Sequence, residues 1–248
     1  MQLAYRRRKS NGRSGAKVIL LLAVIVLIAM VFMRTSESKP APSASNLNVV
    51  RIDIRPGVRI QPIIVRNGKA IGDLFSTVIR KHRPYAAING TYFDADMRPL
   101  GDILIDGKLV NRGHYRNAVA FTKKGKVVFL HVKSGRLNWK GCISGIACGP
   151  RLIHGAKIAL DPVSEGFSRR SLTKEAIRSG VGVTADGDLL LVTSKGNLTL
   201  RQFADSMLKI GAVDAINFDG GSASGLYYNG KTITTPVLPM SNMLLIYR

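Results

Sequence analysis

The 248-residue sequence predicts an α+β domain with a largely antiparallel β-sheet core, a few packed helices and a single N-terminal transmembrane helix. The sheet is predicted from many short segments rich in β-branched residues and from the hairpin-type dipeptides between them. The transmembrane helix is predicted from one uninterrupted apolar run near the N-terminus. With 46% hydrophobic and 21% charged residues, the chain falls in the ordinary globular range and is neither disordered nor fibrous.

The apolar run, residues 18–33, carries no charged or polar side chain. Six basic residues precede it and only Arg34 and Lys39 follow it closely, so the positive-inside rule places the N-terminus in the cytoplasm. We expect a basic cytoplasmic tail over residues 1–17, an uncleaved transmembrane anchor over 18–33 and a linker over 34–45. A cleaved signal peptide is the alternative, although the run is slightly long for one and no clean Ala-x-Ala follows it.

The remaining domain, residues 46–248, is predicted to lie in the periplasm or outside the cell, held at the inner membrane by one pass. The whole chain has 37 Lys+Arg against 15 Asp+Glu, a net charge of +22. Beyond residue 39 there remain 29 basic and 14 acidic residues, about +15, which favours an anionic partner. A nucleic-acid partner is not expected, because the domain has one Trp and no recognition motif. The sequence leaves the oligomeric state open.

Seven segments are predicted as strands because they are β-branched or aromatic-rich and most are bounded by turn residues. They are residues 47–54, 58–65, 118–122, 127–132, 181–184, 189–194 and 213–218. Four dipeptides predict short hairpin loops, since their glycines can take positive φ. These are Asp106-Gly107, Lys124-Gly125, Asp186-Gly187 and Asn229-Gly230.

Two helices are predicted. The first covers residues 71–82. The second, starting at Leu200, repeats apolar residues at i, i+3, i+4, i+7 and i+8, which gives it one apolar face. Thr199 and Gln202 predict a capping box at its start, and Gly211 predicts its end.

Polar and glycine residues are concentrated where two apolar strands end. Asn89-Gly90 follows the strand ending at Ile88 and leads to Asp94; an ordinary strand-to-turn exit explains this equally well. Asp219 ends another strand and is followed by Gly220, Gly221 and Ser222. Glycines let backbone N–H groups approach an anion, and the Asp could act as acid, base or nucleophile. A flexible turn capped by the Asp is the alternative; neither a phosphate-binding P-loop nor a nucleophile elbow is present.

A third candidate stretch combines Gly149-Pro150 with Arg178, which precedes a glycine-punctuated strand. A guanidinium can bind a phosphate bidentately, although a single Arg in so basic a domain is more often a solvated surface charge.

Cys142 and Cys148 lie close in sequence, and an oxidising compartment permits their pairing, so a local disulfide is predicted, with two free thiols as the alternative. No cofactor and no metal site is predicted, because the four His are scattered and no EF-hand spacing occurs.

Several of these residues belong to an ordered set of motifs that extends over the outer domain. The set is Ala87-Ile88-Asn89-Gly90-x-x-Phe93, Pro99-x-Gly101, Asp106-Gly107, Gly149-Pro150-x-Leu152, Arg178, Gly182-Val183-Thr184-x-Asp186-Gly187, Thr199-Leu200 and Gly211-Ala212-x-x-Ala215-x-Asn217-x-Asp219-Gly220-Gly221-Ser222. It resembles the phosphodiester glycosidase family, and within it the short bacterial exported branch. Thr91 departs from the pattern, since the family usually has a second Gly there.

The resemblance implies hydrolysis of the bond between a sugar anomeric carbon and a phosphodiester oxygen. The family motif positions are occupied by Asn89, Arg178, Asp219, Gly220, Gly221 and Ser222. We infer that Asp219 is the main carboxylate, that Asn89 contacts a sugar hydroxyl, and that Arg178 and the 220–222 loop bind the phosphate. Asp94 is the weaker candidate for a second carboxylate.

The expected function is therefore that of a membrane-anchored hydrolase acting on glycosyl phosphodiesters in envelope or exopolysaccharide material. The alternative is a non-catalytic module that binds anionic glycans or lipid headgroups, which the charge of the domain would equally favour.

Overall fold

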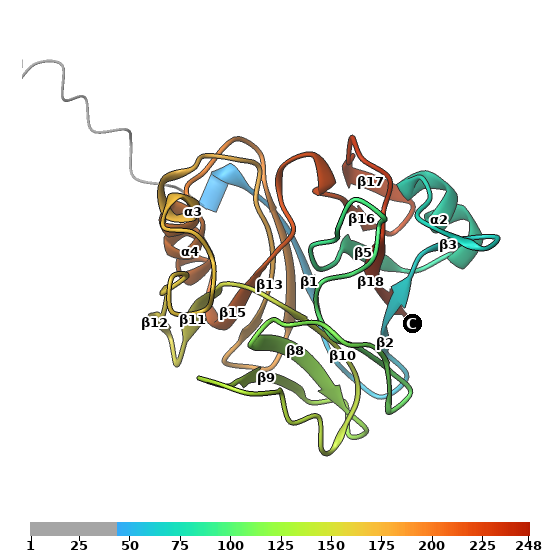
Figure 1. The fold of residues 1–248 in the computed structure, drawn as a ribbon, viewed down its shortest axis with the longest axis horizontal. Helices are drawn as coiled ribbons and strands as arrows, with labels where there is room; N and C mark the ends of the chain where they lie inside the picture. The colour runs from blue at the N-terminus through green and yellow to red at the C-terminus, as the bar shows by residue number, and fades with distance from the viewer. Residues whose placement is uncertain (1–43) are drawn as a thin grey trace, which may run out of the picture. The chain divides into compact units, whose positions relative to one another are not determined.

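Three large antiparallel sheets and one two-stranded sheet carry the fold in residues 44–248, the part of the chain that the computed structural model describes (Figure 1). A short 3₁₀ helix, Ala44–Asn46, leads into the first sheet. The strand order of that six-stranded sheet is β1 (Leu47–Ile52), β14 (Leu189–Ser194), β13 (Ser179–Thr184), β15 (Ala212–Phe218), β11 (Arg151–His154) and β12 (Lys157–Ile158).

The two other large sheets have five strands each. The second is ordered β7 (Lys108–Asn111), β6 (Ile103–Ile105), β10 (Cys142–Cys148), β8 (Asn117–Thr122) and β9 (Val127–His131). The third is ordered β17 (Lys231–Thr234), β16 (Leu226–Tyr228), β5 (Ala86–Asn89), β18 (Asn242–Tyr247) and β2 (Arg59–Ile64). The two-stranded sheet pairs β3 (Arg66–Asn67) with β4 (Ala70–Ile71). The predicted sheet-dominated α+β class is confirmed.

One hydrophobic core joins the three large sheets. Val181, Ile216 and Phe218 enter it from the first sheet, Ile146 from the second and Ile88 from the third, all at most 1% exposed. Strand β14 places Leu189 and Leu191 in this core and Leu190 and Val192 in a second core under α4. Because both of its faces are buried, it has a continuous apolar sequence. The packing places the ends of β5 and β15, far apart in sequence, in the same part of the molecule.

All seven predicted strands form, as β1, β2, β8, β9, β13, β14 and β15. The four predicted hairpin dipeptides connect β6 to β7, β8 to β9, β13 to β14 and β16 to β17. Asp106 and Gly107 have φ of 48° and 73°, and Asn229 and Gly230 have 45° and 85°. Positive φ at both central residues is the geometry that matches the twist of the flanking strands.

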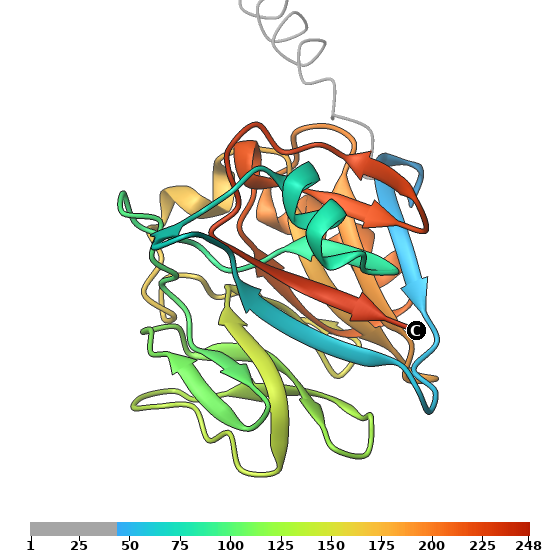
Figure 2. The ribbon, with the colours of Figure 1, turned by 90° about the vertical axis from the view of Figure 1, so that its right-hand side faces the viewer.

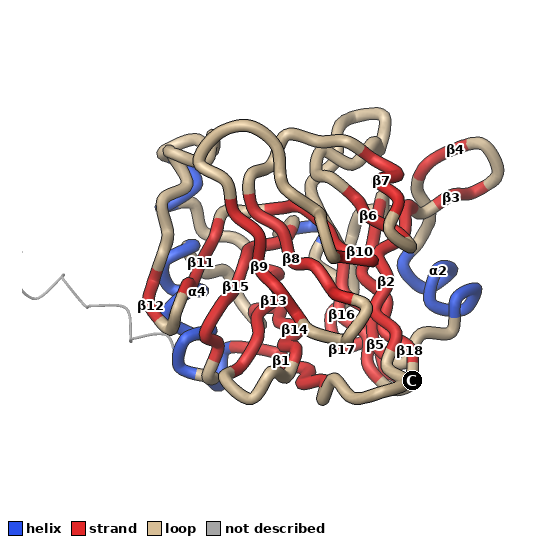
Figure 3. Tube along the Cα trace, turned by 90° about the horizontal axis from the view of Figure 1, so that it is seen from below, coloured by secondary structure: helices blue, strands red, loops and turns tan. Residues whose placement is uncertain are grey.

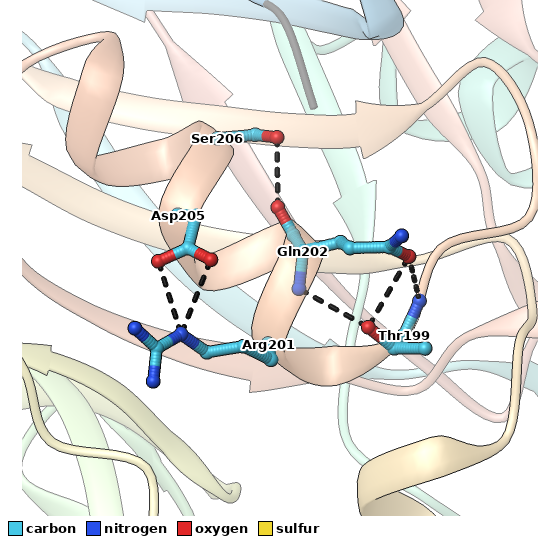
Figure 4. A network of polar contacts seen from close by, with 5 residues as sticks. All are labelled: Thr199, Arg201, Gln202, Asp205 and Ser206. Atoms are coloured by element: carbon cyan, nitrogen blue, oxygen red, sulfur yellow. Dashed lines mark hydrogen bonds and ion pairs between the residues drawn. The ribbon is translucent and has the colours of Figure 1, made fainter. Parts of the chain in front are cut away.

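Helix α4 (Leu200–Lys209) begins and ends where the sequence predicts, and Figure 4 shows the polar contacts at its start. The Thr199 hydroxyl accepts a 3.2 Å hydrogen bond from the Gln202 N–H, and the Gln202 side chain accepts one of 2.9 Å from the Thr199 N–H. Gly211 follows the helix at φ 92°. The apolar face, with Phe203 and Met207 fully buried, packs on β11, β12 and β15 of the first sheet.

Helix α2 (Phe75–His82) begins four residues later than the predicted 71–82. Ile71 pairs with Arg66 in β4, and Gly72 has φ 109°, which a helix does not allow. Phe75 and Val78 are buried against the third sheet, which α2 covers in Figure 2. Helices α2 and α4 lie outside the strands, at opposite ends of the view in Figure 3. A third, one-turn helix, α3 (Arg170–Thr173), contacts α4.

The predicted disulfide is wrong. Cys142 and Cys148 are free cysteines at the two ends of the same strand, β10. A strand rises about 3.3 Å per residue, so their Cα atoms are far beyond the reach of about 4.4–6.8 Å that a disulfide requires. The sequence separation suggested a small loop, but Gly145 lies inside the strand and does not bend the chain back.

The predicted cytoplasmic tail, the transmembrane anchor and nearly all of the linker lie outside the described residues. Within residues 44–248, none of the helices has both the length and the apolar character that a membrane crossing requires.

Candidate active site

The two strand ends singled out in the sequence, after β5 and after β15, lie side by side. The Asn89 side-chain Nδ2 donates a 2.7 Å hydrogen bond to the Asp219 carbonyl, and the Asp219 N–H donates one of 3.1 Å to the Gly90 carbonyl. The Asn89 Oδ1 accepts a 3.1 Å bond from the Gly225 N–H. Asn89, 2% exposed, therefore holds both ends of the loop that follows Asp219.

Two glycines of these motifs are required by close packing. A Cβ placed at Gly90 would lie 2.0 Å from the Asn242 Oδ1, which accepts a hydrogen bond from the Thr91 N–H. A Cβ at Gly220 would lie 2.7 Å from the Ile177 carbonyl, next to Arg178. Any larger residue would push the loop away from its neighbours, so the glycines set where the Asp219 carboxylate lies.

The Asp219 carboxyl is the most perturbed acid of this loop. Burial raises its pKa from the ordinary 3.8 to about 6, and a hydrogen bond from the Gly220 N–H acts in the opposite direction. A carboxyl whose pKa lies near neutrality can exchange protons or carry charge under working conditions, which is a property of catalytic carboxyls.

Two tyrosines lie near this carboxylate. Burial, and then the nearby Cys148 and Asp219, raise the pKa of both Tyr92 and Tyr115, so both phenols stay protonated. The Tyr92 hydroxyl donates a 3.1 Å bond to the Gly149 carbonyl and accepts one of 2.8 Å from the Asn217 Nδ2. The Gly149-Pro150 stretch thus meets the end of β15 through the Tyr92 hydroxyl.

Aromatic rings form one wall of the site. The Tyr115 and Phe167 rings stack in parallel with their centroids 5.4 Å apart, and Tyr92 lies 5.5 Å from Tyr115 and 6.0 Å from Phe167. The His114 ring lies 4.6 Å from that of Tyr115. Ligand sites are predominantly lined by such rings, with a few polar groups that fix orientation.

Arg178 lies beside this loop, and its side chain bonds to the backbone of neighbouring segments. It is 8% exposed; Nε donates a 2.8 Å bond to the Leu198 carbonyl, and Nη2 donates to the Lys174 carbonyl. Burial lowers its pKa, while the nearby Tyr92 acts in the opposite direction. Two of the five guanidinium N–H donors are thus used by backbone carbonyls, which fixes the orientation of the side chain, and three N–H groups have no bond to a carbonyl among the described residues.

The other predicted site residues have local roles. The Asp94 Oδ1 accepts 2.9 Å bonds from the Asp96 and Arg98 N–H groups, so this carboxylate caps its own turn. Ser222 is exposed, and its carbonyl accepts bonds from the Val237 and Leu238 N–H groups at 2.8 and 3.0 Å. Gly221 belongs to the short 3₁₀ helix Gly221–Ala223 and has φ 61°.

Glu165 is a second perturbed carboxyl that the sequence analysis missed. Burial raises its pKa to about 7, although the Arg151 N–H and the Asn117 side chain bond to it and lower the pKa. The Asn117 Nδ2 donates to Glu165 Oε2 over 2.6 Å. Glu165 lies in a segment of turns without repeating pattern, so only its acidic character could have marked it.

No group of three or more His, Cys, Asp or Glu side chains in residues 44–248 is arranged to hold a metal ion.

The protein is a sheet-rich domain in which two strands, β5 and β15, end side by side at glycine-containing loops. A carboxyl with a raised pKa, that of Asp219, lies where these strand ends meet. Residues 82–247 match the model of the phosphodiester glycosidase family, and the chain belongs to that family. This confirms the resemblance drawn from the motifs and makes the domain one of a family of glycosidase-type hydrolases. No curated protein matches the sequence.

Solved structures share this fold. A hypothetical protein from Synechocystis superposes with a TM-score of 0.71 at 19% identity, over 81% of this chain and 58% of the other, so the chain spans little more than half of that protein. The zebrafish N-acetylglucosamine-1-phosphodiester α-N-acetylglucosaminidase catalytic domain, auto-inhibited by its pro-peptide, superposes with a TM-score of 0.62 at 17% identity, over 82% of this chain and 88% of that domain. At these identities the likeness concerns the fold.

Proposed function

We propose that this protein hydrolyses the glycosidic bond of sugar-1-phosphodiesters, with Asp219 as the catalytic carboxylate. The observation that carries the proposal is the position of Asp219, with its raised pKa, in the loop that the family motif forms. The name of the zebrafish enzyme with this fold, an N-acetylglucosamine-1-phosphodiester α-N-acetylglucosaminidase, supports this substrate class.

In the proposed reaction, the bond between the anomeric carbon and the phosphodiester oxygen breaks. The water oxygen forms the new bond to that carbon, one water proton is released, and the products are a free sugar and a phosphomonoester. Positive charge develops at the anomeric carbon, and the ionised Asp219 carboxylate would stabilise it. The leaving phosphate oxygen is a weak base, so it needs less protonation than the leaving group of an alkyl glycoside.

The aromatic wall would bind the apolar face of the sugar, and the two tyrosine hydroxyls would contribute polar contacts. Asn89 is proposed as a positioning residue, because its amide binds the Asp219 carbonyl and the Gly225 N–H. Arg178 has the same kind of role, since it bonds to the Lys174 and Leu198 carbonyls next to the Gly220 loop.

The test is turnover of a panel of sugar-1-phosphodiesters by the full-length protein, with the products identified by mass spectrometry. Asp219→Asn keeps the side-chain shape but removes the charge, and we expect kcat to fall at least about a hundredfold. Asp186→Asn makes the same change at an exposed hairpin turn and is the matched control. A folded Asp219→Asn protein that turns over at the wild-type rate would refute the catalytic assignment. Substrate binding without turnover by the wild type would instead favour the non-catalytic module.

The location of the enzyme is part of the proposal. The basic residues before the apolar run 18–33 support a single-pass anchor in the cytoplasmic membrane, with the domain on the outer side and a substrate in envelope or exopolysaccharide material. A reporter enzyme that is active only in the periplasm, fused after Arg248, should be active. An inactive reporter in an expressed fusion would contradict this topology.

A further inference from the structure

A cavity of about 410 Å³ opens at the edge of the first and second sheets, lined by residues outside the Asp219 loop. Its lining includes Arg116, His131, Lys133, Arg151 and Glu165. These residues come from the start of β8, the end of β9, the start of β11 and the segment before α3. Arg151 lies inside the Gly149-Pro150-x-Leu152 motif, whereas the other four were not candidates in the sequence, because they are separated along the chain and belong to no motif.

Cationic side chains dominate this cavity. Among residues 44–248, the ion pairs that form do not involve Arg116, Lys133 or Arg151. The Arg116 Nη1 donates 3.0 Å bonds to the Lys133 and Ser164 carbonyls, which fixes its guanidinium at the rim. Unpaired cations held around a concave surface create a positive potential that attracts an anion.

The pKa of His131, which also lines the cavity, reflects this positive potential. Burial, and then the charges of Arg151, His154 and Lys133, lower the pKa of His131. The His131 Nδ1 lies 2.8 Å from the Asn117 Oδ1, and the Asn117 Nδ2 donates to Glu165. Two carboxyls, Asp161 and Glu165, also line the cavity and partly offset the three cations, and the Arg151 charge acts to lower the pKa of Glu165. Burial keeps a large fraction of Glu165 uncharged near neutral pH.

The cavity adjoins the Asp219 site through Gly149 and Phe167. A Cβ placed at Gly149 would lie 3.2 Å from Glu165 Oε2 and 3.2 Å from the Phe167 ring. The Gly149 carbonyl accepts the bond from the Tyr92 hydroxyl, and Phe167 stacks on Tyr115. A ligand lying along this wall would contact the aromatic rings at one end and the cations at the other.

We propose that this cavity is a phosphoryl-binding subsite, in which Lys133 and Arg151 bind the oxyanion of the substrate while its sugar lies at the aromatic wall. Arginine and lysine are the side chains that bind phosphate by charge-assisted hydrogen bonds. The subsite adds cations to the phosphate-binding role expected of Arg178, whose Nε and Nη2 already donate to the Leu198 and Lys174 carbonyls. Its place in catalysis rests on the proposed function, whereas its affinity for phosphate does not.

The experiment measures the binding of inorganic phosphate to the full-length protein by titration calorimetry, with chloride at matched ionic strength as the reference. In Lys133→Gln/Arg151→Gln we expect the Kd for phosphate to rise at least about tenfold, because two charged donors are lost. Lys108→Gln/Lys231→Gln removes the same charge from two exposed hairpin positions and should leave the Kd unchanged. Melting without phosphate verifies folding, and the single variant Lys133→Gln replaces the double variant if the latter does not fold.

An equal Kd for the cavity variant and the control variant would overturn the subsite, as would no saturable phosphate response in the wild type. Asp219→Asn should keep its affinity for phosphate. If phosphate binds as expected and no sugar-1-phosphodiester is hydrolysed, the proposed function fails while the subsite stands. If hydrolysis occurs and the cavity variant binds phosphate like the control, the subsite fails alone.

Discussion

The Asn89 Nδ2 lies 2.7 Å from the Asp219 carbonyl oxygen, and this bond joins two chain segments 130 residues apart. The return bond from the Asp219 N–H to the Gly90 carbonyl makes the connection two-sided. Because Asn89 also accepts from Gly225, one buried amide determines where the loop after β15 begins and ends.

Asn89→Ala should therefore reduce both stability and activity. It leaves the Asp219 carbonyl and the Gly225 N–H without their partner, at a cost of about 1–3 kcal/mol in the free energy of unfolding. The carboxylate loses its fixed position, and we expect kcat to fall about ten- to a hundredfold. Urea unfolding and steady-state kinetics on the same preparation test this. Full stability with lost activity would show instead that Asn89 contacts the substrate directly.

The sequence predicted those parts of the fold that depend on neighbouring residues in the chain. Asp106-Gly107 and Asn229-Gly230 form their hairpins because both residues adopt positive φ, which local sequence alone favours. The start of α2 was placed too early because Ile71 is apolar at a helical spacing, yet it pairs with Arg66 instead. That pairing and the division into three sheets depend on contacts between distant segments, which a local pattern does not contain.

Arg178→Lys should lower stability more than an exposed Arg→Lys change does. A lysine ammonium cannot bond to both the Lys174 and the Leu198 carbonyl in the geometry of the guanidinium. We expect a loss of about 1.5–3 kcal/mol in the free energy of unfolding, the range for hydrogen bonds to charged groups. Arg201→Lys, whose exposed i,i+4 pair with Asp205 contributes about 0.3–0.5 kcal/mol, is the control. Equal losses in urea titrations of the two variants would contradict the positioning role.

The sequence predicted only part of the candidate site, and a physical reason separates the residues it predicted from those it did not. Asp219 and the glycines around it carry a signal because close approach to Ile177 and Asn242 excludes larger residues. Tyr115, Phe167 and Glu165 come from loops whose sequences have no periodicity. Only the fold brings the two rings to Tyr92 and Glu165 to Gly149. Residue type alone also does not reveal that two N–H donors of Arg178 bond to backbone carbonyls.

The two cysteines should differ in reactivity. In native protein that has not been reduced, alkylation should modify Cys142 before Cys148, because Cys142 is half-buried and Cys148 fully buried. Burial raises the pKa of the Cys148 thiol to about 12, so its reactive thiolate is scarce. Peptide mass spectrometry over a time course gives the order. After unfolding without reductant both should be alkylated, and a pair that resists alkylation until reduction would restore the disulfide.

The pH dependence of stability should identify the buried Asp219 carboxyl. Its pKa is raised from 3.8 to about 6 in the folded protein, so the native state binds the proton more tightly than the unfolded chain. Proton binding by Asp219 therefore stabilises the folded state, and this stabilisation is fully present below about pH 4. It is lost as the pH rises through about 6, where the buried group becomes charged.

Asp219→Asn removes this titration, so the Tm of the variant relative to wild type should rise between pH 4 and pH 8. Asp186→Asn, at an exposed turn, controls for the loss of one negative charge elsewhere on the domain. Melting curves of the three proteins across this pH range decide the matter. A relative Tm that stays constant, or that falls as the pH rises, would mean that Asp219 ionises freely. The carboxylate would then lack the desolvated surroundings from which its catalytic role is argued.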